Sequence, residues 1–303
     1  MSEIQQYEQT EAGACQWPRQ ENSRMSKEPT DVSGDQKIRT GINGEYIFDN
    51  TRPQAESRFS LLSSLYDERS IHYIEQRGIQ EGWSCLEVGA GGGSIAAWLS
   101  SRAGATGRVL ATDIDPRLLQ ALTFPNLEVR QHDIRNEPLP EREFDLVHAR
   151  LLLIHLPERE LALKRMVAAL KPGGWIVLEE FDEPSLLPHP TLFSGDDVLK
   201  LRDAFQQVLT ARGANVRYGS ALARRLQANG LMNVGAEVNG SMWQSGSAGT
   251  SLMKLACQEL RELIVGTGLI TESEFDADMK RADEPDFLMP SPVMWTAWGQ
   301  LGG

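Results

Sequence analysis

The chain has 303 residues, 41% of them hydrophobic, which is enough for one large or two ordinary domains with a sizeable core. Forty-two acidic against thirty basic residues give a formal charge of -12. This charge argues against sequence-independent binding to nucleic acid or to an anionic membrane and favours a small-molecule partner. The N-terminus is polar, no apolar run could span a bilayer, and three scattered cysteines signal neither a disulfide framework nor a zinc site. We therefore expect a cytoplasmic protein without a metal site.

Residues 1–50 are rich in Gln, Glu, Ser, Asp and Gly and show no sustained apolar period. Such a composition cannot bury enough surface to offset the entropy lost on ordering. We expect a flexible N-terminal arm that ends with a short apolar piece at residues 46–48. Two interpretations stay open, a dispensable tail and a flap over a pocket.

Residues 51–303 are expected to form the folded domain, because strands and helices alternate along them. Apolar runs predict strands at residues 83–88, 109–112, 127–131, 144–149, 175–178, 234–238 and 293–298. Helical periodicity falls between them and predicts an α/β fold with a doubly wound, mostly parallel sheet. Residues 54–78 and 190–225 are predicted to form a helical cap, and residues 252–264 a further helix.

The stretch from Cys85 to Gly93 is an apolar strand that turns at glycines into a helix, which is how a chain presents amide groups to a ligand. Its glycines follow Glu87 at intervals of two. The dinucleotide-binding fingerprint instead places its third glycine three residues after the second. The spacing therefore makes a dinucleotide the poorer fit.

Five segments in order resemble class I S-adenosylmethionine-dependent methyltransferases of the small-molecule, ubiquinone-biosynthesis-like kind. They are residues 86–93 (LEVGAGGG), 111–115 (ATDID), 132–134 (HDI), 144–150 (FDLVHAR) and 170–174 (LKPGG). The resemblance implies a Rossmann-like methyltransferase fold with a seven-stranded sheet and S-adenosylmethionine as the cofactor. It also implies a set of cofactor-binding residues: Glu87, Gly89, Ala90, Gly91, Asp113, Ile114, Asp133, Ile134 and Arg150.

The resemblance gives roles to the residues of the glycine turn and of the second strand. Gly89 and Gly91 would let the backbone approach the methionine part of the cofactor, with Glu87 near its ammonium group. Asp113 would accept from the two ribose hydroxyls. Asp115 is interpreted as a helix cap because Pro116 follows it.

Later strand ends would hold the adenine and complete the site. Asp133 would accept from the adenine amino group, Ile134 would donate its backbone amide, and Ile114 would pack on the ring. Arg150 ends the fourth strand, where the backbone of this family meets the methionine amine. On the same strand, Asp145 and His148 are interpreted as structural, His148 as a packed, hydrogen-bonded histidine.

Methyl transfer from a sulfonium needs a positioned acceptor, and a base only for some acceptor atoms. The predicted catalytic residues are His155, whose ordinary pKa suits a base, and Glu180 and Asp182, as bases or as anchors for a cationic amine. Helix packing for His155 and surface solvation for the two acids stay open as alternatives. Three further side chains are weaker candidates for the same pocket: Tyr66, His72 and His189.

We therefore expect transfer of a methyl group to O, N or C of a small, secondary-metabolite-like acceptor. No Asn-Pro-Pro-Tyr sequence follows the fourth strand, which weighs against methylation of nucleic-acid or glutamine amino groups. Two alternatives remain: a cyclase or isomerase that keeps the cofactor without transfer, and a regulatory protein that retains the fold. A homodimer through the helix at residues 250–265 or through Trp295 and Trp298 is also considered, although these residues suit a core better.

Overall fold

The structure is a computed structural model that describes residues 47–48, 54–182 and 197–303. Of the predicted N-terminal arm only Ile47 and Phe48 are among them, and His189 lies outside the described residues. Within the described part of the chain, no helix combines the length and the apolar character needed to cross a membrane.

The helices and strands follow one another in the alternation that the sequence predicts. The strands are β1 (Ser84–Val88), β2 (Arg108–Asp113), β3 (Leu127–Gln131), β4 (Phe144–Arg150), β5 (Leu170–Asp182), β6 (Met232–Asn239), β7 (Met242–Gln244), β8 (Leu288–Pro290) and β9 (Val293–Gln300). The α-helices are α1 (Gln54–Glu75), α2 (Ser94–Ala103), α3 (Arg159–Ala168), α4 (Asp197–Ala211), α5 (Leu222–Ala228), α6 (Ala248–Glu259), α7 (Arg261–Gly266) and α8 (Glu272–Arg281). Short 3-10 helices are η1 (Pro116–Ala121), η2 (Leu153–His155) and η4 (Gly219–Ala221).

Seven strands form one sheet in the order β3-β2-β1-β4-β5-β9-β6. The first five pair in parallel, and β9 runs antiparallel to both β5 and β6. The strand order reverses between β1 and β4, and in such sheets ligands bind beside the carboxyl ends of the strands at this point. The predicted doubly wound, mostly parallel, seven-stranded sheet is confirmed.

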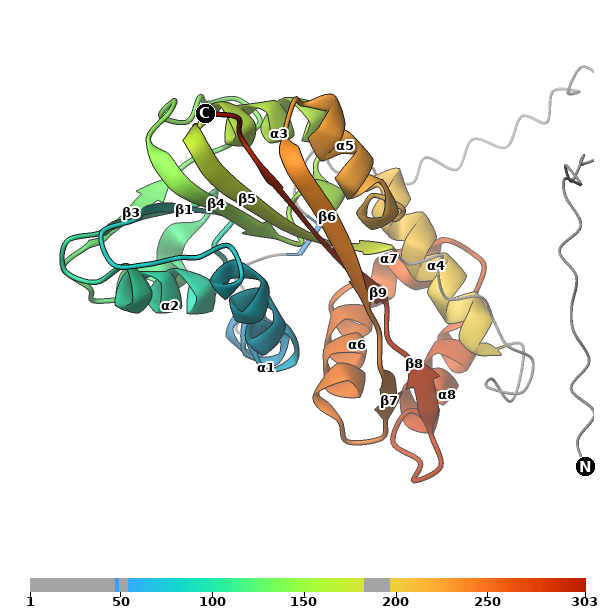
Figure 1. Cartoon of the computed structure of the whole chain (residues 1–303). Helices are drawn as coiled ribbons and strands as arrows, with labels where there is room; N and C mark the ends of the chain where they lie inside the picture. The colour runs from blue at the N-terminus through green and yellow to red at the C-terminus, as the bar shows by residue number, and fades with distance from the viewer. Residues whose placement is uncertain (1–46, 49–53, 183–196) are drawn as a thin grey trace, which may run out of the picture. The chain divides into compact units, whose positions relative to one another are not determined.

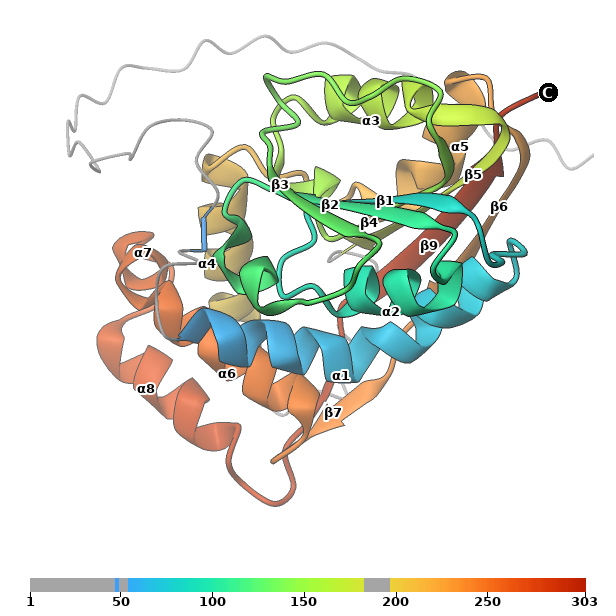
Figure 2. The same ribbon diagram turned by 90° about the vertical axis from the view of Figure 1, so that its left-hand side faces the viewer.

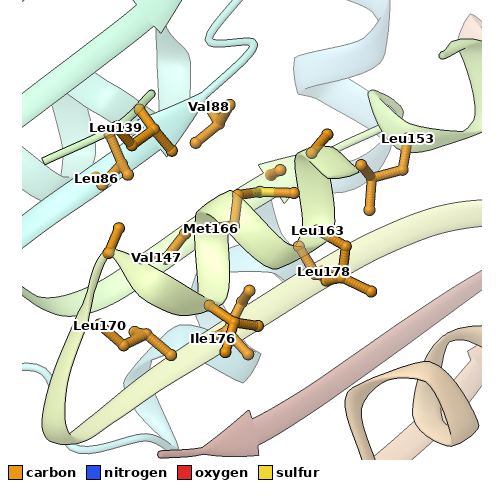
Figure 3. Packing of buried hydrophobic residues seen from close by; sticks show 14 of the residues in the cluster. Leu86, Val88, Leu139, Val147, Leu153, Leu163, Met166, Leu170, Ile176 and Leu178 are labelled. Carbon is orange, nitrogen blue, oxygen red and sulfur yellow. The ribbon is translucent and has the colours of Figure 1, made fainter. Parts of the chain in front are cut away.

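Helices cover both faces of this sheet, as the two views of Figures 1 and 2 show. On one face α3 packs near the central strands, where Leu163 and Met166 lie against Val147 and Leu178 (Figure 3), and α5 packs on β9 and β6. On the other face α1 and α2 contribute to a second apolar cluster with β1, β2 and β5. Coverage of both faces explains why the parallel strands read as almost continuous apolar runs.

A separate apolar cluster forms the helical cap, from α4, α6, α7 and α8 together with Phe48. The helical cap of the structure comprises different residues from the predicted cap. Residues 219–225 lie in η4 and α5, where Leu222 packs into the core of the sheet, while residues 248–281 belong to the cap. The small β7–β8 ribbon joins the cap as well, since Trp243 packs against Gly249 of α6.

Two predicted elements differ in extent. The strand predicted at 175–178 begins at Leu170, because the Lys-Pro-Gly-Gly segment before it already belongs to the strand. The helix at 252–264 is two helices, separated at Leu260 by a non-helical φ of -102°. The predicted dimer surface lies in the cores, since α6 packs on α1 and Trp298 stacks on Tyr73.

Candidate functional site

The backbone of the glycine turn after β1 is hydrogen-bonded to the end of β2. The amides of Gly89 and Ala90 both donate to the carbonyl of Thr112, at 2.8 and 3.0 Å. Gly89, Gly91 and Gly93 all have φ between +53° and +81°, a region that residues other than glycine rarely adopt. The turn therefore requires glycine for its conformation, and it delivers the chain into α2 at Ser94.

Helix α1 closes one side of this turn. The ring of Phe59 packs against Gly91 and Gly92 so tightly that a Cβ on either glycine would approach within 3 Å. A hydrogen bond of 2.9 Å between Ser63 of α1 and Ser94 of α2 fixes the same contact. The glycines thus serve close packing as well as conformation.

Asp113, the last residue of β2, organises the turn through both carboxylate oxygens. Its Oδ2 accepts from the amide of Gly91 at 2.8 Å and its Oδ1 from the amide of Asp115 at 2.9 Å. Burial raises the pKa of Asp113, although these backbone hydrogen bonds act in the opposite direction. Asp115 caps η1 by accepting from the amide of Arg117, with Pro116 at the first helical position, as the sequence predicts.

The end of β3 carries a second acidic group. Asp133 accepts from the guanidinium of Arg135 at 2.9 Å and from Asn136 at 2.8 Å, and the hydrogen bond from Arg135 lowers its pKa despite partial burial. Ile134 beside it is buried, whereas Ile114 at the end of β2 is 43% exposed. An exposed isoleucine at a cavity wall offers an apolar surface to a flat ring.

Strand β4 places a histidine between two glutamates on the face of the sheet that helix α1 covers. His148 is fully buried, and its Nδ1 lies 2.7 Å from Oε2 of Glu87 while its Nε2 lies 3.2 Å from Oε2 of Glu179. The structural interpretation of His148 is therefore supported by its contacts. Asp145 near the start of the same strand accepts from the amide of Ser84 and from Lys171, also as a structural residue.

A cavity of about 330 Å³ joins these groups to the cap. All nine predicted cofactor-binding residues line it, including Arg150, whose guanidinium donates to Asp67 and Ser70 of α1. The cap side of the cavity is largely apolar and aromatic, with walls that include Phe48, Phe205, Trp243, Leu252, Met253 and Phe287. One continuous space therefore has a polar wall on the sheet and an apolar wall on the cap.

The three predicted catalytic residues lie in different places. His155 lines the cavity, where burial and the charge of Arg58 lower its pKa to about 4. Glu180 is fully buried outside the lining, and its carboxylate accepts from the backbone amides of η2 and the residue before it, at 2.6 to 3.2 Å. Burial raises the pKa of Glu180 to about 8. Asp182 is also buried and does not line the cavity.

The weaker pocket candidates do not line the cavity where the structure describes them. Tyr66 packs edge-on against Phe181, which does line it, and His72 is exposed and bonded to Gln76. Among the described residues, no three His, Cys, Asp or Glu side chains come together as a metal site would require.

Sequence reasoning missed the residues that shape the cavity from outside the sheet. Phe59 stands on the predicted helical segment 54–78, and Trp243, Phe205 and Phe287 stand on elements whose order gives no sign of convergence. Apolar side chains at helical spacing look the same in a core and in a pocket wall, so no local signal could have found them.

The family model described as a methyltransferase domain matches residues 55–235. The chain belongs to this family. Membership confirms the resemblance to class I S-adenosylmethionine-dependent methyltransferases and S-adenosylmethionine as the cofactor that goes with the family.

Two kinds of known protein are similar to this chain. The ubiquinone/menaquinone biosynthesis C-methyltransferases UbiE of Pseudomonas putida and Pseudomonas fluorescens are 32% and 33% identical over 120 residues, which is 37% of this chain and 47% of theirs. The chain thus spans about half the length of these curated relatives.

Solved structures with little sequence identity share the fold. The YcgJ protein of Bacillus subtilis has a TM-score of 0.52 at 14% identity, covering 76% of this chain and 97% of its own. Phosphoethanolamine N-methyltransferase 2 of Haemonchus contortus has a TM-score of 0.51 at 13% identity, covering 84% of this chain and 59% of its own.

Proposed function

We propose that this methyltransferase moves a methyl group from S-adenosylmethionine to a small, largely apolar acceptor held between the sheet and the cap. The observation that carries the proposal is the single cavity, with acidic groups and glycine amides on one wall and aromatic side chains on the other. The cofactor would supply a methyl group on a positively charged sulfur, which is already activated for in-line displacement. The protein then needs to orient two partners and exclude water.

The residues on the sheet side fit this cofactor chemically. Gly89 and Gly91 line the cavity without a side chain of their own, and Leu152 and Phe59 pack against them. Glu87 would face the ammonium group, and Asp113 would accept from the ribose hydroxyls. Both carboxylates are nearly buried, which strengthens their attraction for donors that displace water.

The adenine would lie at the rim near β3. Asp133 would accept from its amino group, Ile134 would donate its amide, and Ile114 would cover the ring face. Ala90 and the end of β4 at Arg150 would complete the wall around the methionine part. These assignments are carried by position at the carboxyl ends of adjacent strands, where the reversal of strand order opens a crevice.

The acceptor would occupy the cap side, where the walls are apolar and aromatic. A drug-sized apolar molecule gains affinity there by leaving water, while few polar groups remain to fix its orientation. The UbiE relatives act in ubiquinone and menaquinone biosynthesis by their names, which makes aromatic ring compounds the first acceptors to try. His155 lines the cavity, and its pKa, lowered to about 4, keeps the ring neutral at pH 7 but also makes it a weak base, so it would take a proton only from an acidic acceptor.

The test is incubation of the purified protein with S-adenosylmethionine and a panel of apolar aromatic compounds that offer C, O or N as the acceptor. Mass spectrometry would locate an added methyl group, and S-adenosylhomocysteine would be released in equal amount. Product without a methyl group and without S-adenosylhomocysteine would instead indicate a cyclase or isomerase. A Trp243→Ala variant should raise the KM for the acceptor and leave the KM for the cofactor within twofold.

Two predictions of cellular context remain part of the proposal. We place the protein in a reducing cytoplasm because its three cysteines are widely separated in the sequence and show no paired spacing. A homodimer stays a prediction, and light scattering of the purified chain would decide it.

A further inference from the structure

Three buried ionisable side chains lie together on the central strands of the sheet, at positions where a core usually has apolar residues. Glu87, His148 and Glu179 come from the neighbouring strands β1, β4 and β5, and at most 4% of any of them is exposed. The ring of His148 lies between the two carboxylates, one at each nitrogen. Burying such a group costs free energy unless every charge is paired, so its presence at this place calls for a reason.

The imidazole is the shared partner of both acids. Burial alone would lower the pKa of His148, but the charge of Glu87 and the hydrogen bonds with both glutamates raise it to about 9. Burial likewise opposes ionisation of Glu179, yet the hydrogen bond from His148 holds the pKa of Glu179 below its ordinary value. At neutral pH the ring is an imidazolium with both nitrogens donating.

The array continues from Glu179 to helix α1. The Oε1 atom of Glu179 accepts from the hydroxyl of Thr296 at 2.8 Å, and its Oε2 accepts from the hydroxyl of Ser70 in α1. Arg150 then donates to Ser70 and to Asp67, each at 2.8 Å. The groups that face His148 from all sides are therefore the two glutamates, with Arg150 beyond them.

Only one member of the charged trio lines the cavity, and that is Glu87. Its Oε2 is committed to His148, which fixes the direction of the carboxylate at the place where the methionine end of the cofactor would lie. A glutamate has three rotatable bonds, so an unsupported carboxylate would lose that direction.

We infer that His148 is a positioning residue, which aims the Glu87 carboxylate at the ammonium group of the cofactor and links it through Glu179 to helix α1. The inference rests on the proposed function. It assigns to His148 a task that a purely structural histidine does not have, namely support for one part of one ligand.

The experiment compares two ligands by titration calorimetry on the full chain. S-Adenosylhomocysteine carries the amino acid part, and 5′-methylthioadenosine shares the adenosine and the sulfur but lacks that part. In His148→Gln the affinity for S-adenosylhomocysteine should fall about tenfold, while the affinity for methylthioadenosine stays within twofold. Adding Glu87→Gln to His148→Gln should cost no further affinity, because both changes remove one interaction.

Asp145→Asn is the matched control, since it changes a paired carboxylate on the same strand but at the end away from the cavity. Its ratio of the two affinities should equal that of the original protein. Equal losses for both ligands in His148→Gln, or no loss for either, would overturn the inference. If His148→Gln does not fold, Glu179→Gln decides, because an unchanged affinity ratio in that variant overturns the inference as well. Binding of neither ligand by the unaltered chain would contradict the proposed function instead.

Discussion

The ring of Phe59 lies over Gly91 so closely that a Cβ built on the glycine would stand 2.4 Å from the Cε1 atom of the ring. Phe59 and Gly91 are 32 residues apart in sequence, yet a larger side chain at position 91 would require the Phe59 ring to move. Gly91 also has a φ of +53°, which residues with a Cβ rarely adopt. The turn therefore requires glycine here both for its conformation and for the contact with Phe59. Helix α1 is therefore a wall of the cavity, which Phe59, Leu62 and Ser63 line.

Gly91→Ala should damage both stability and cofactor binding. Alanine in the left-handed region costs about 1 to 2 kcal/mol, and the displaced Phe59 would in addition open the wall of the site. We expect the affinity for S-adenosylhomocysteine in calorimetry to fall more than tenfold. Gly173→Ala is the control, because Gly173 has a φ of +82° with nothing within 4 Å of a Cβ. In urea titration it should lose only the backbone cost of about 1 to 2 kcal/mol, and it should bind the ligand normally; equal binding by both variants would refute the role of the contact.

Asp113→Ala should weaken cofactor binding by about 1 to 3 kcal/mol, the cost of leaving buried polar partners unpaired. The loss has two sources, the ribose hydroxyls and the Gly91 amide that the carboxylate now holds at 2.8 Å. Asp115→Ala removes the neighbouring helix cap and should lower stability while leaving the dissociation constant within twofold. An unchanged dissociation constant in Asp113→Ala would remove this residue from the site.

Glu180→Ala should destabilise the fold by about 1 to 3 kcal/mol, because buried backbone amides of η2 lose their acceptor. Glu180→Gln retains an acceptor oxygen and should lose less in the same urea titration. We assign Glu180 this structural task because it is fully buried and does not line the cavity. A folded Glu180→Gln protein that had lost methyl transfer more than a hundredfold would restore the catalytic interpretation.

Stability should fall with rising pH because of His148. Its pKa is about 9 in the folded state against an ordinary value of 6.5, so the stabilisation is complete below pH 6.5 and is lost as the pH rises through 9. The shift corresponds to at most about 3 kcal/mol. Glu180, with a raised pKa of about 8, acts in the same direction, so the measurement is the difference between the original protein and His148→Gln. Their free energies of unfolding should converge between pH 6 and pH 9.5, and a constant gap would contradict the prediction.

The sheet and the polar wall of the cavity could be predicted because each strand end carries a local signature. The segment from Glu87 to Gly93 predicts the glycine turn, and Asp113 at the end of the next strand predicts an acidic group beside it. Parallel pairing then brings the two strand ends together. Glu180 shows the limit of this reasoning. Adjacent residues on a strand point to opposite faces, and the sequence of β5 does not say which face the cavity occupies.

The cap could not be predicted to the same extent, because its walls come from distant elements. Helix α8 begins with a capping box between Thr271 and Glu274. The sequence displays this signal, although the predicted elements do not include the helix. No comparable signal brings Trp243 of the β7–β8 ribbon and Phe205 of α4 to the same cavity. Their convergence depends on tertiary packing alone, and so does the choice of acceptor.

The measurement that tests the account most directly is calorimetric titration of the full chain with S-adenosylmethionine and, separately, with NAD. The account predicts saturable binding of S-adenosylmethionine that Asp113→Ala weakens, and no heat of binding with NAD. Tight binding of NAD without any response to S-adenosylmethionine would contradict it.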